Sequence, residues 1–278
     1  MKPKYFKSKK VKILDSKEFK FGKIDGIKIT ELSDLAYHDG ILYGVSDQGF
    51  FYKFALDIKN KKIQDIKPLK GMKLKNKRGK TLKKSKRDAE GLCYVDGKFL
   101  ISFERRPRVE YFNHHAKKIK KAKIGKKLLN LDNYISKNKA LEAVTYSKKY
   151  GVVTAPELPL KKRKKSQHTI YTKIKNFKFN AAGSITAFEF IDDDKILVLM
   201  REYSFFKRYL KITLLSVDFS NGDVDILLKM DSQKGWNVDN FEGLTKVGDN
   251  LYLMVSDDNE SMFQKTLFVL FELKIPLK

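Results

Sequence analysis

Short apolar runs separated by polar turns recur along most of the chain, and they follow one plan. Each unit begins with an acidic or small polar residue, continues through two apolar strands joined by a turn, and ends with an acidic residue. Five such units are present, and their starts lie about 50 residues apart, which is close to the period of propeller blades. The units begin at Ser33, Glu90, Glu142, Thr186 and Glu242.

Two further strand-like runs follow the first two strands in the complete units. In the fourth unit these runs span residues 209–219 and 223–230, and Asn221-Gly222 between them is a strong hairpin signal. Four antiparallel strands make one propeller blade. The last unit has only three strands, so the N-terminal run 11–21 is expected to supply the missing outer strand and close the ring.

We therefore predict an all-β fold, a β-propeller of five four-stranded blades, as a single domain over residues 1–278. Six blades is the alternative if a long loop contains another sheet. Two separate β-sandwiches explain neither the regular period nor the unpaired first strand. No convincing helix-period stretch exceeds about three turns, which agrees with an all-β chain.

Propeller topology brings the acidic residues of the repeat together. The first strand of each blade lines the central channel and the second runs antiparallel beside it, so the start of one and the end of the other lie at the same mouth. Two sets of carboxylates are expected there, one at the starts of first strands (Glu90, Glu142 and Glu242) and one at the ends of second strands (Asp47, Glu104, Glu157, Glu202 and Asp257).

Carboxylates crowded in one place cannot all stay ionised without compensation. A cation such as Ca²⁺, which takes six to eight oxygen ligands, is one solution. Guanidinium partners are another, and Arg105, Arg106 and Arg201 stand next to the ring positions. For the first set an equally simple interpretation remains open, in which each glutamate accepts hydrogen bonds from the backbone of the next blade. For the second set a binding site is favoured.

The charge of the chain is strongly positive, with 59 Lys and Arg against 33 Asp and Glu, or +26. Only eight of these basic residues are arginine, the residue that reads guanine and phosphate by paired hydrogen bonds. Lysines concentrate at residues 70–87, 117–127 and 161–165. Solvated loops explain this simply, and weak attraction of a polyanion is the alternative. No motif supports specific nucleic-acid binding.

Other classes are limited by what the sequence lacks. No apolar run approaches 18 residues, so we expect no transmembrane segment, and the first ten residues do not form a signal peptide. The single cysteine, Cys93, excludes an intramolecular disulfide and a cysteine zinc cluster, and it is expected to be a small core residue.

Several repeat signatures resemble those of the phytase-like domain family, known as "esterase-like activity of phytase", which comprises bacterial propeller proteins. The clearest is Asp239-Asn240-Phe241-Glu242-Gly243-Leu244-Thr245, followed by Val255-Ser256-Asp257-Asp258-Asn259. Others are Asp88-Ala89-Glu90-Gly91-Leu92 with Ser102-Phe103-Glu104, Leu141-Glu142-Ala143 with Ala155-Pro156-Glu157, and Ile196-Leu197-Val198-Leu199-Met200-Arg201-Glu202. Ala143 departs from the glycine that is usual at that position.

The resemblance implies ester or phosphoester hydrolysis, often in exported bacterial proteins, so a periplasmic or secreted location is expected. We therefore predict a hydrolase that acts, as a monomer, on a small anionic ester or phosphoester at the channel mouth. The expected roles are catalysis by Glu142, Glu242 and Glu157, substrate binding by Arg105, Arg201 and Arg106, and Ca²⁺ binding by Glu90, Asp47, Asp257, Glu104 and Glu202. The alternative is a non-catalytic propeller that binds a protein, glycan or polyanion through its lysine-rich rim.

Overall fold

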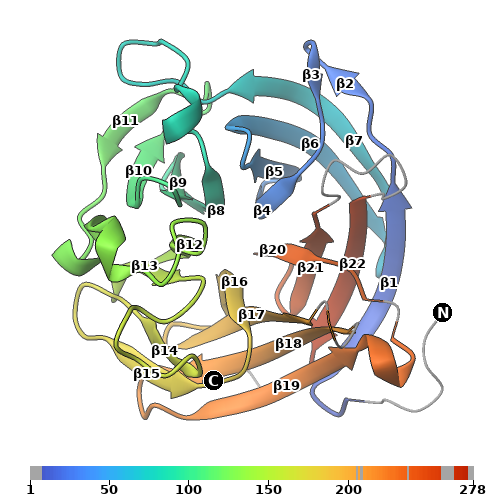
Figure 1. Cartoon of the computed structure of the whole chain (residues 1–278). Coiled ribbons are helices and arrows are strands. Elements are labelled where there is room, and N and C mark those ends of the chain that lie inside the picture. The colour runs from blue at the N-terminus through green and yellow to red at the C-terminus, as the bar shows by residue number, and fades with distance from the viewer. Residues whose placement is uncertain (1–7, 205, 207–208, 237, 258–265, 275–278) are drawn as a thin grey trace.

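Antiparallel sheets surround a central axis in the computed structural model (Figure 1). The structure describes residues 8–204, 206, 209–236, 238–257 and 266–274. The prediction of an all-β propeller is confirmed. Within the described residues the helical elements are four short 3₁₀ turns, and none is long and apolar enough to cross a membrane. These turns are η1 (Lys84–Lys86), η2 (Lys126–Leu129), η3 (Leu131–Asn133) and η4 (Ser232–Lys234).

Four blades have complete four-stranded sheets. Three of them consist of consecutive strands, in the order found in the sequence. They are β4 (Leu32–His38), β5 (Ile41–Ser46), β6 (Phe50–Lys59) and β7 (Lys62–Lys73); β8 (Ala89–Val95), β9 (Lys98–Phe103), β10 (Arg108–Phe112) and β11 (Lys118–Lys121); and β16 (Ser184–Phe190), β17 (Lys195–Ser204), β18 (Tyr209–Asp218) and β19 (Val224–Asp231).

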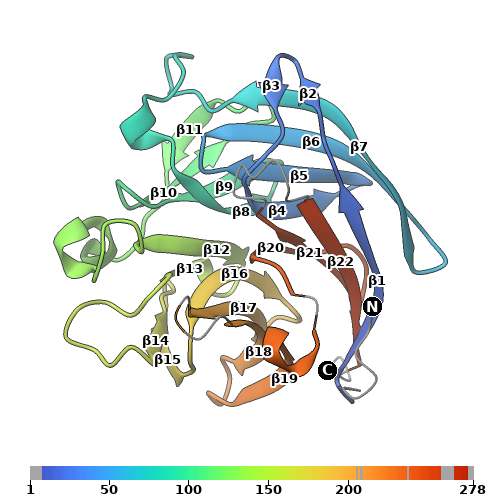
Figure 2. The ribbon, with the colours of Figure 1, turned by 45° about the vertical axis from the view of Figure 1, so that its right-hand side comes forward.

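The fourth sheet combines three strands from late in the chain with one strand from early in it. Its strands are β20 (Phe241–Lys246), β21 (Leu251–Ser256), β22 (Thr266–Leu273) and β1 (Val11–Phe19). β1 pairs antiparallel with β22, from Val11 opposite Leu273 to Phe19 opposite Thr266. In Figure 2 the two strands lie side by side along the outer edge of the molecule.

Between the β8–β11 and β16–β19 sheets lie two two-stranded ladders, β12 (Leu141–Ser147) with β13 (Gly151–Pro156), and β14 (Gln167–Ile170) with β15 (Phe177–Asn180). A pair of hydrogen bonds between Thr154 and Tyr171, of 3.0 and 2.8 Å, connects β13 to the segment that follows β14. A further short hairpin, β2 (Lys23–Ile24) with β3 (Ile27–Lys28), lies against β7.

Local sequence explains the tight hairpins that face away from the predicted site. Asp39-Gly40 and Asp96-Gly97 both have positive φ at each residue, from 47° to 76°. That is the geometry of type I′ turns, which match the twist of antiparallel strands. Apolar side chains from adjoining sheets then fill the space between them, as Val45, Phe51 and Phe99 do between the first two.

One buried carboxylate joins three sheets near the axis. Asp34 of β4 accepts hydrogen bonds from the backbone N–H of Leu92 in β8 at 2.8 Å and of Leu244 in β20 at 3.0 Å. It also accepts from its neighbour Leu35 at 2.8 Å. Asp34 is fully buried, and burial raises its pKa well above the usual value despite these three donors. Asp34 thus acts as the structural staple between inner strands.

We expect Asp34→Ala to lower the free energy of unfolding by roughly 3 kcal/mol, because two N–H groups on neighbouring sheets lose their buried acceptor. Denaturant unfolding measures this. Asp65→Ala is the matched control, since exposed Asp65 accepts the same local bond from Ile66 at 2.9 Å but joins no sheets. Equal losses in the two variants would show that Asp34 is not a staple.

Candidate functional site

The innermost strands share a backbone irregularity at one end. In β4, β8, β12, β16 and β20 the pairing with the next strand shifts register at the same place. Such a β-bulge leaves an extra residue on one strand and re-aims its side chain. The residues in these bulges include Ser33, Glu90, Glu142, Thr186 and Glu242. The residues that open the sequence repeat are therefore structurally equivalent.

Glycine after two of these glutamates permits a close approach of neighbouring inner strands. A Cβ at Gly91 would lie 2.6 Å from Ser102 Oγ and 2.7 Å from the carbonyl oxygen of Glu142. A Cβ at Gly243 would lie 2.9 Å from Cα of Asp34. The Glu-Gly pairs thus bring adjacent inner strands into contact while their glutamates remain at the mouth. Ala143 takes this position in β12 and is fully buried.

Five of the acidic residues near the axis form two overlapping groups. Ligand oxygens of Asp88, Glu90 and Glu104 lie within 4.8 Å of one another, and so do those of Glu104, Glu142 and Glu157. Glu104 belongs to both groups. Glu104, Glu142 and Glu157 are all less than a tenth exposed. The structure thus brings together four of the predicted carboxylates, Glu90, Glu104, Glu142 and Glu157, and adds Asp88 to them.

Two of these carboxylates have no direct hydrogen-bond or ion-pair partner among the described residues. No hydrogen bond or ion pair joins the side chain of Glu90 or Glu142 to any residue that the structure describes. Burial, followed by repulsion from neighbouring carboxylates, raises the pKa of both well above the usual range for glutamate. Neither glutamate makes the backbone bonds expected of a staple, so that interpretation does not describe them.

Glu104 differs from these two because it also has a structural bond. Its Oε1 accepts a hydrogen bond of 3.0 Å from the backbone N–H of Ala140, in the segment that leads into β12. Burial, assisted by Asp88 and Glu157 and opposed by the bond from Ala140, raises the pKa of Glu104 to about 8. This residue both ties two sheets together and contributes an oxygen to each carboxylate group.

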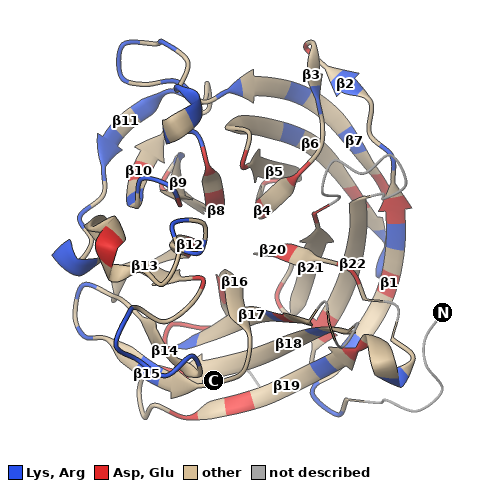
Figure 3. Cartoon of the chain, viewed as in Figure 1, with Lys and Arg blue, Asp and Glu red and all other residues tan. Residues whose placement is uncertain are grey.

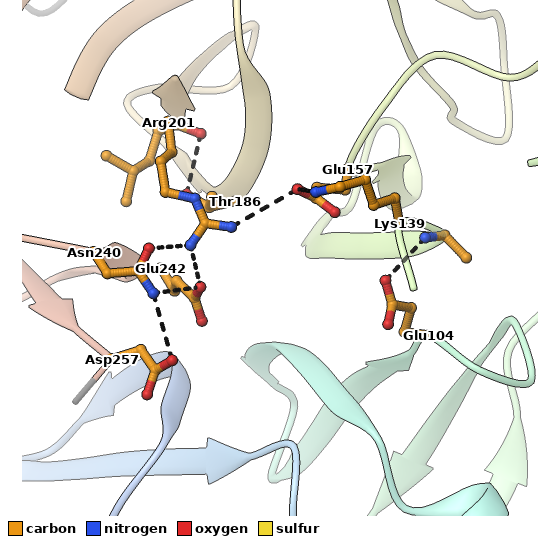
Figure 4. A network of polar contacts seen from close by, with 10 residues as sticks. Glu104, Lys139, Glu157, Thr186, Arg201, Asn240, Glu242 and Asp257 are labelled. Atoms are coloured by element: carbon orange, nitrogen blue, oxygen red, sulfur yellow. Dashed lines mark hydrogen bonds and ion pairs between the residues drawn. The ribbon is translucent and has the colours of Figure 1, made fainter. Parts of the chain in front are cut away.

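Arg201 is the main cation at the mouth (Figure 4). Its Nη1 donates to Asn240 Oδ1 and to Glu242 Oε1, and its Nη2 lies 3.7 Å from Glu157 Oε1. Asn240 in turn donates to Glu242 at 3.0 Å and to Asp257 at 3.4 Å. Burial lowers the pKa of Arg201, but Glu242, Glu157 and Glu142 together raise it above the usual value. Arg201 therefore remains positively charged.

A cavity of about 680 Å³ adjoins this network. Its lining includes Glu157, Arg201, Asn240 and Glu242 as well as Lys139, whose Nζ lies 2.8 Å from Glu157 Oε1. The Lys139 side chain is 44% exposed, so its ammonium reaches solvent. The cavity thus places two cationic groups beside the buried carboxylates and has room for a small anionic molecule.

Asp47 lies in a neighbouring part of the mouth. Burial, together with the nearby carboxylates of Glu31 and Asp88, raises its pKa to about 7. Its Oδ1 is buried and has no hydrogen-bond partner within the described part of the chain. Glu31 is held in position by Gln48, whose Nε2 donates to it at 2.9 Å. Asp47 is thus a further acidic group with an unsatisfied oxygen.

The structure places two predicted residues, Glu202 and Arg106, away from the carboxylate groups. Glu202 is not at the mouth: it accepts a hydrogen bond from Tyr209 and lines a separate cavity beside Trp236. The reason is register. Pro156 and Ser256 pair with the residues that precede the bulges in β12 and β20, and Met200 pairs with the residue that precedes the bulge in β16. The next residue in each second strand is therefore equivalent, so Arg201 takes the position of Glu157 and Asp257. A shift of one residue turns a strand side chain to the opposite face.

Arg105 and Arg106 lie in the turn after Glu104, at the rim. Arg105 Nε is 3.0 Å from Asp88 Oδ2, whereas Arg106 is exposed and its carbonyl accepts a hydrogen bond from Arg108. Arg105 thus contacts the carboxylate groups, and Arg106 does not.

Several site residues were missed by the sequence analysis, namely Glu31, Asp88, Lys139 and Asn240. Three of them precede a bulge residue by two positions: Glu31 before Ser33, Asp88 before Glu90, and Asn240 before Glu242. Side chains two apart in a strand share a face, so this spacing was the signal available.

Comparisons with known proteins agree with the propeller fold. A family model described as "Esterase-like activity of phytase" matches residues 27–260. No curated protein matches the chain. Among solved structures, the chain is similar to Myxococcus xanthus glutaminyl cyclase, with a TM-score of 0.51, 11% identity and coverage of 95% of this chain and 97% of that one. The Pan2 WD40 domain of Neurospora crassa has a TM-score of 0.43, 9% identity and 98% coverage of both chains.

We expect the stability of the cation-free protein to fall as pH rises from about 4 to about 8. The folded state keeps protons on Asp47 and Glu104, whose pKa values are about 7 and about 8, that the unfolded chain has already released. Thermal unfolding in EDTA measures Tm at each pH, and a decrease of roughly 5 °C is expected from these groups. Adding Ca²⁺ should raise Tm strongly at pH 8 and little at pH 5.

The double variant Glu104→Gln with Glu142→Gln serves as the comparison, because neither glutamine titrates. Its Tm should change less with pH between 4 and 8 and should respond less to Ca²⁺. Parallel pH profiles for the two proteins would contradict the assignment of these carboxylates.

Proposed function

The chain belongs to the phytase-like family, described as esterase-like activity of phytase, and we propose that it hydrolyses a phosphoester or related ester at the channel mouth. The observation that supports this most directly is the pair of Glu142, which is buried, and Glu90, which is half-buried, because neither has a hydrogen-bond or ion-pair partner in the described structure. Buried carboxylates without compensation are costly. A function that requires their charge gives a reason for holding them together.

The donor set fits a hard divalent cation, and Ca²⁺ is the cation we propose. Ca²⁺ is bound by oxygen ligands, most often carboxylates, and it accepts irregular arrangements of six to eight of them. Asp88, Glu90 and Glu104, whose ligand oxygens lie within 4.8 Å of one another, would hold it. Such a cation would restore the ionised state of the glutamates whose pKa values are raised.

A bound divalent cation polarises an ester or phosphoryl oxygen and lowers the pKa of water. The protein's own groups would perform the remaining tasks. Arg201 and Lys139 line the cavity and would bind the anionic part of the substrate. Glu242 and Asn240 hold the guanidinium of Arg201 in place. Glu142, buried beside Glu104 and Glu157, would accept a proton at its carboxylate as the general base.

We also propose that β12–β15 form a fifth blade and that β1 closes the ring. The support is the strand order β12-β13-β14-β15, joined through Thr154 and Tyr171, and the pairing of β1 with β22. In this arrangement the innermost strands β4, β8, β12, β16 and β20 each pack against the next around the axis. The carboxylate groups then lie between the β8–β11 blade and the β12–β15 blade.

The test is hydrolysis of p-nitrophenyl phosphate and p-nitrophenyl acetate by the purified chain, first in EDTA and then with added Ca²⁺. We expect turnover that depends on the cation. Glu142→Gln should lower kcat at least about 100-fold, in the range by which removal of a general base slows an enzyme.

Glu202→Gln is the matched control, because Glu202 also stands at the end of a second strand but lies outside the mouth. Its activity should remain within about twofold of the original chain. A folded protein that hydrolyses neither ester in either condition would overturn the enzymatic proposal and leave the binding alternative.

A further inference from the structure

A second feature of the mouth face is a basic groove beside the second blade. Two adjoining cavities, of about 750 and 620 Å³, share Asn76, Lys118 and Lys121 in their linings. Together they are lined by ten basic side chains and one acidic side chain, Glu110. We call this feature the basic groove. It lies outside the carboxylate groups described above.

Most of the positive charge in the basic groove is not neutralised by the protein. Glu110 is 2% exposed and forms ion pairs with Arg108 at 3.2 Å and with Lys118. Its carboxylate is therefore paired with these two residues and does not neutralise the other basic side chains of the groove. Arg105 is paired with Asp88. Seven other basic side chains have no carboxylate partner among the described residues: Lys77, Arg78, Lys80, Lys83, Lys86, Arg106 and Lys121. Their charges are available to an anionic ligand.

The lysine-rich loop between β7 and β8, residues 74–88, forms one wall of the groove and is held in place by backbone hydrogen bonds. Lys75 N donates to the carbonyl of Ala116 at 2.8 Å, and Lys118 N donates to the carbonyl of Lys75 at 2.9 Å, so the loop is paired with the start of β11. Within the loop, Leu82 N donates to the carbonyl of Leu74 at 2.9 Å. Both leucines are buried in the core between the first two blades. The loop therefore holds its like charges close together despite their repulsion.

Arg108 fixes the opposite wall to this loop. Its guanidinium lies 3.7 Å from the centre of the Phe103 ring and donates to the backbone carbonyls of Arg106, at 3.0 Å, and Lys86. Its side chain is only 14% exposed. By joining the turn after β9 to η1, Arg108 holds Lys86 and Arg106 on either side of the groove before any ligand arrives. Such preorganisation reduces the entropic cost of binding.

The shape and charge of the groove indicate a chain-like polyanion. It extends from Arg105, which is paired with Asp88 of the carboxylate groups, to Lys118 and Lys121 on the outer strand β11. Figure 3 shows basic residues on the loop before β8 and along β11. The lining contains no Phe, Tyr or Trp. Single-stranded nucleic acid is normally bound by stacking its bases on aromatic side chains, so a polymer without bases fits better.

We propose that the basic groove binds a linear phosphate polymer that carries no bases, with one end of the polymer directed towards the channel mouth. The binding depends on the unpaired lysines and Arg106 and not on hydrolysis. It is therefore measured in EDTA, and its success or failure is separate from that of the enzymatic proposal.

The experiment measures binding of fluorescently labelled inorganic polyphosphate by anisotropy at several NaCl concentrations. The test variant is Lys83→Gln, Lys86→Gln and Arg106→Gln in one chain. We expect its Kd to rise at least tenfold at 150 mM salt. The slope of log Kd against log salt should fall by about 2, because each lost phosphate contact removes about 0.7 from the slope for a single strand.

The matched control removes the same charge from another loop of the rim, through Lys161→Gln, Lys162→Gln and Lys164→Gln. These three residues are exposed, as are the three changed in the groove. The control should change Kd less than threefold, and both variants should keep the Tm of the original chain. Equal weakening in the two variants would overturn the proposal, because it would show attraction by net charge alone.

Competition with oligothymidylate of equal charge tests the class of polymer. It should displace polyphosphate at least tenfold less effectively than unlabelled polyphosphate does. Equal or better competition would overturn the proposal in favour of a nucleic-acid site, and the absence of measurable polyphosphate binding would overturn it directly.

Discussion

Close packing of the inner strands around the axis is the constraint on which the site depends. Gly91 and Gly243 have no space for a Cβ, and Asp34 accepts backbone hydrogen bonds from two neighbouring sheets. With the strands held this closely, the side chains at their bulges converge at one mouth. Glu142 is buried there and Glu90 half-buried, neither has a direct partner among the described residues, and their pKa values rise as a result. The same packing that stabilises the ring therefore creates an electrostatic imbalance at its centre.

Much of this arrangement is predictable from the sequence, because the alternation of apolar and polar residues has the same period in every repeat. The strands, the tight Asp-Gly turns and the grouping of Glu90, Glu104, Glu142 and Glu157 all follow from that period and from propeller topology. β14 and β15, of four residues each, have too little regular pattern to define their pairing. Burial of Asp34 is equally hard to predict, since its three donors come from three different strands.

Register is where the sequence argument failed. Counting acidic residues selected Glu202 for the ring, but the bulge in β16 aligns Arg201 with Glu157 and Asp257. A pattern of residue types does not reveal a bulge, because a bulge changes the pairing without changing the strand's composition. The neighbouring pair Arg201-Glu202 offers opposite charges to opposite faces, so an error of one residue reverses the sign of the predicted group.

The position of Arg201 also determines where the imbalance lies. Its guanidinium binds Glu242 and lies near Glu157, so the carboxylates on that side of the mouth are largely compensated. Lys139 adds a second cation to Glu157. On the opposite side Glu90 has no partner in the described structure, and Arg105 reaches only Asp88. Carboxyl groups without a compensating cation are therefore concentrated around Glu90, Glu104 and Glu142, and their raised pKa values favour the protonated form until a cation binds. A cation bound there would face Arg201 and Lys139 across the mouth, and an anion that entered between them would meet positive charge on both sides.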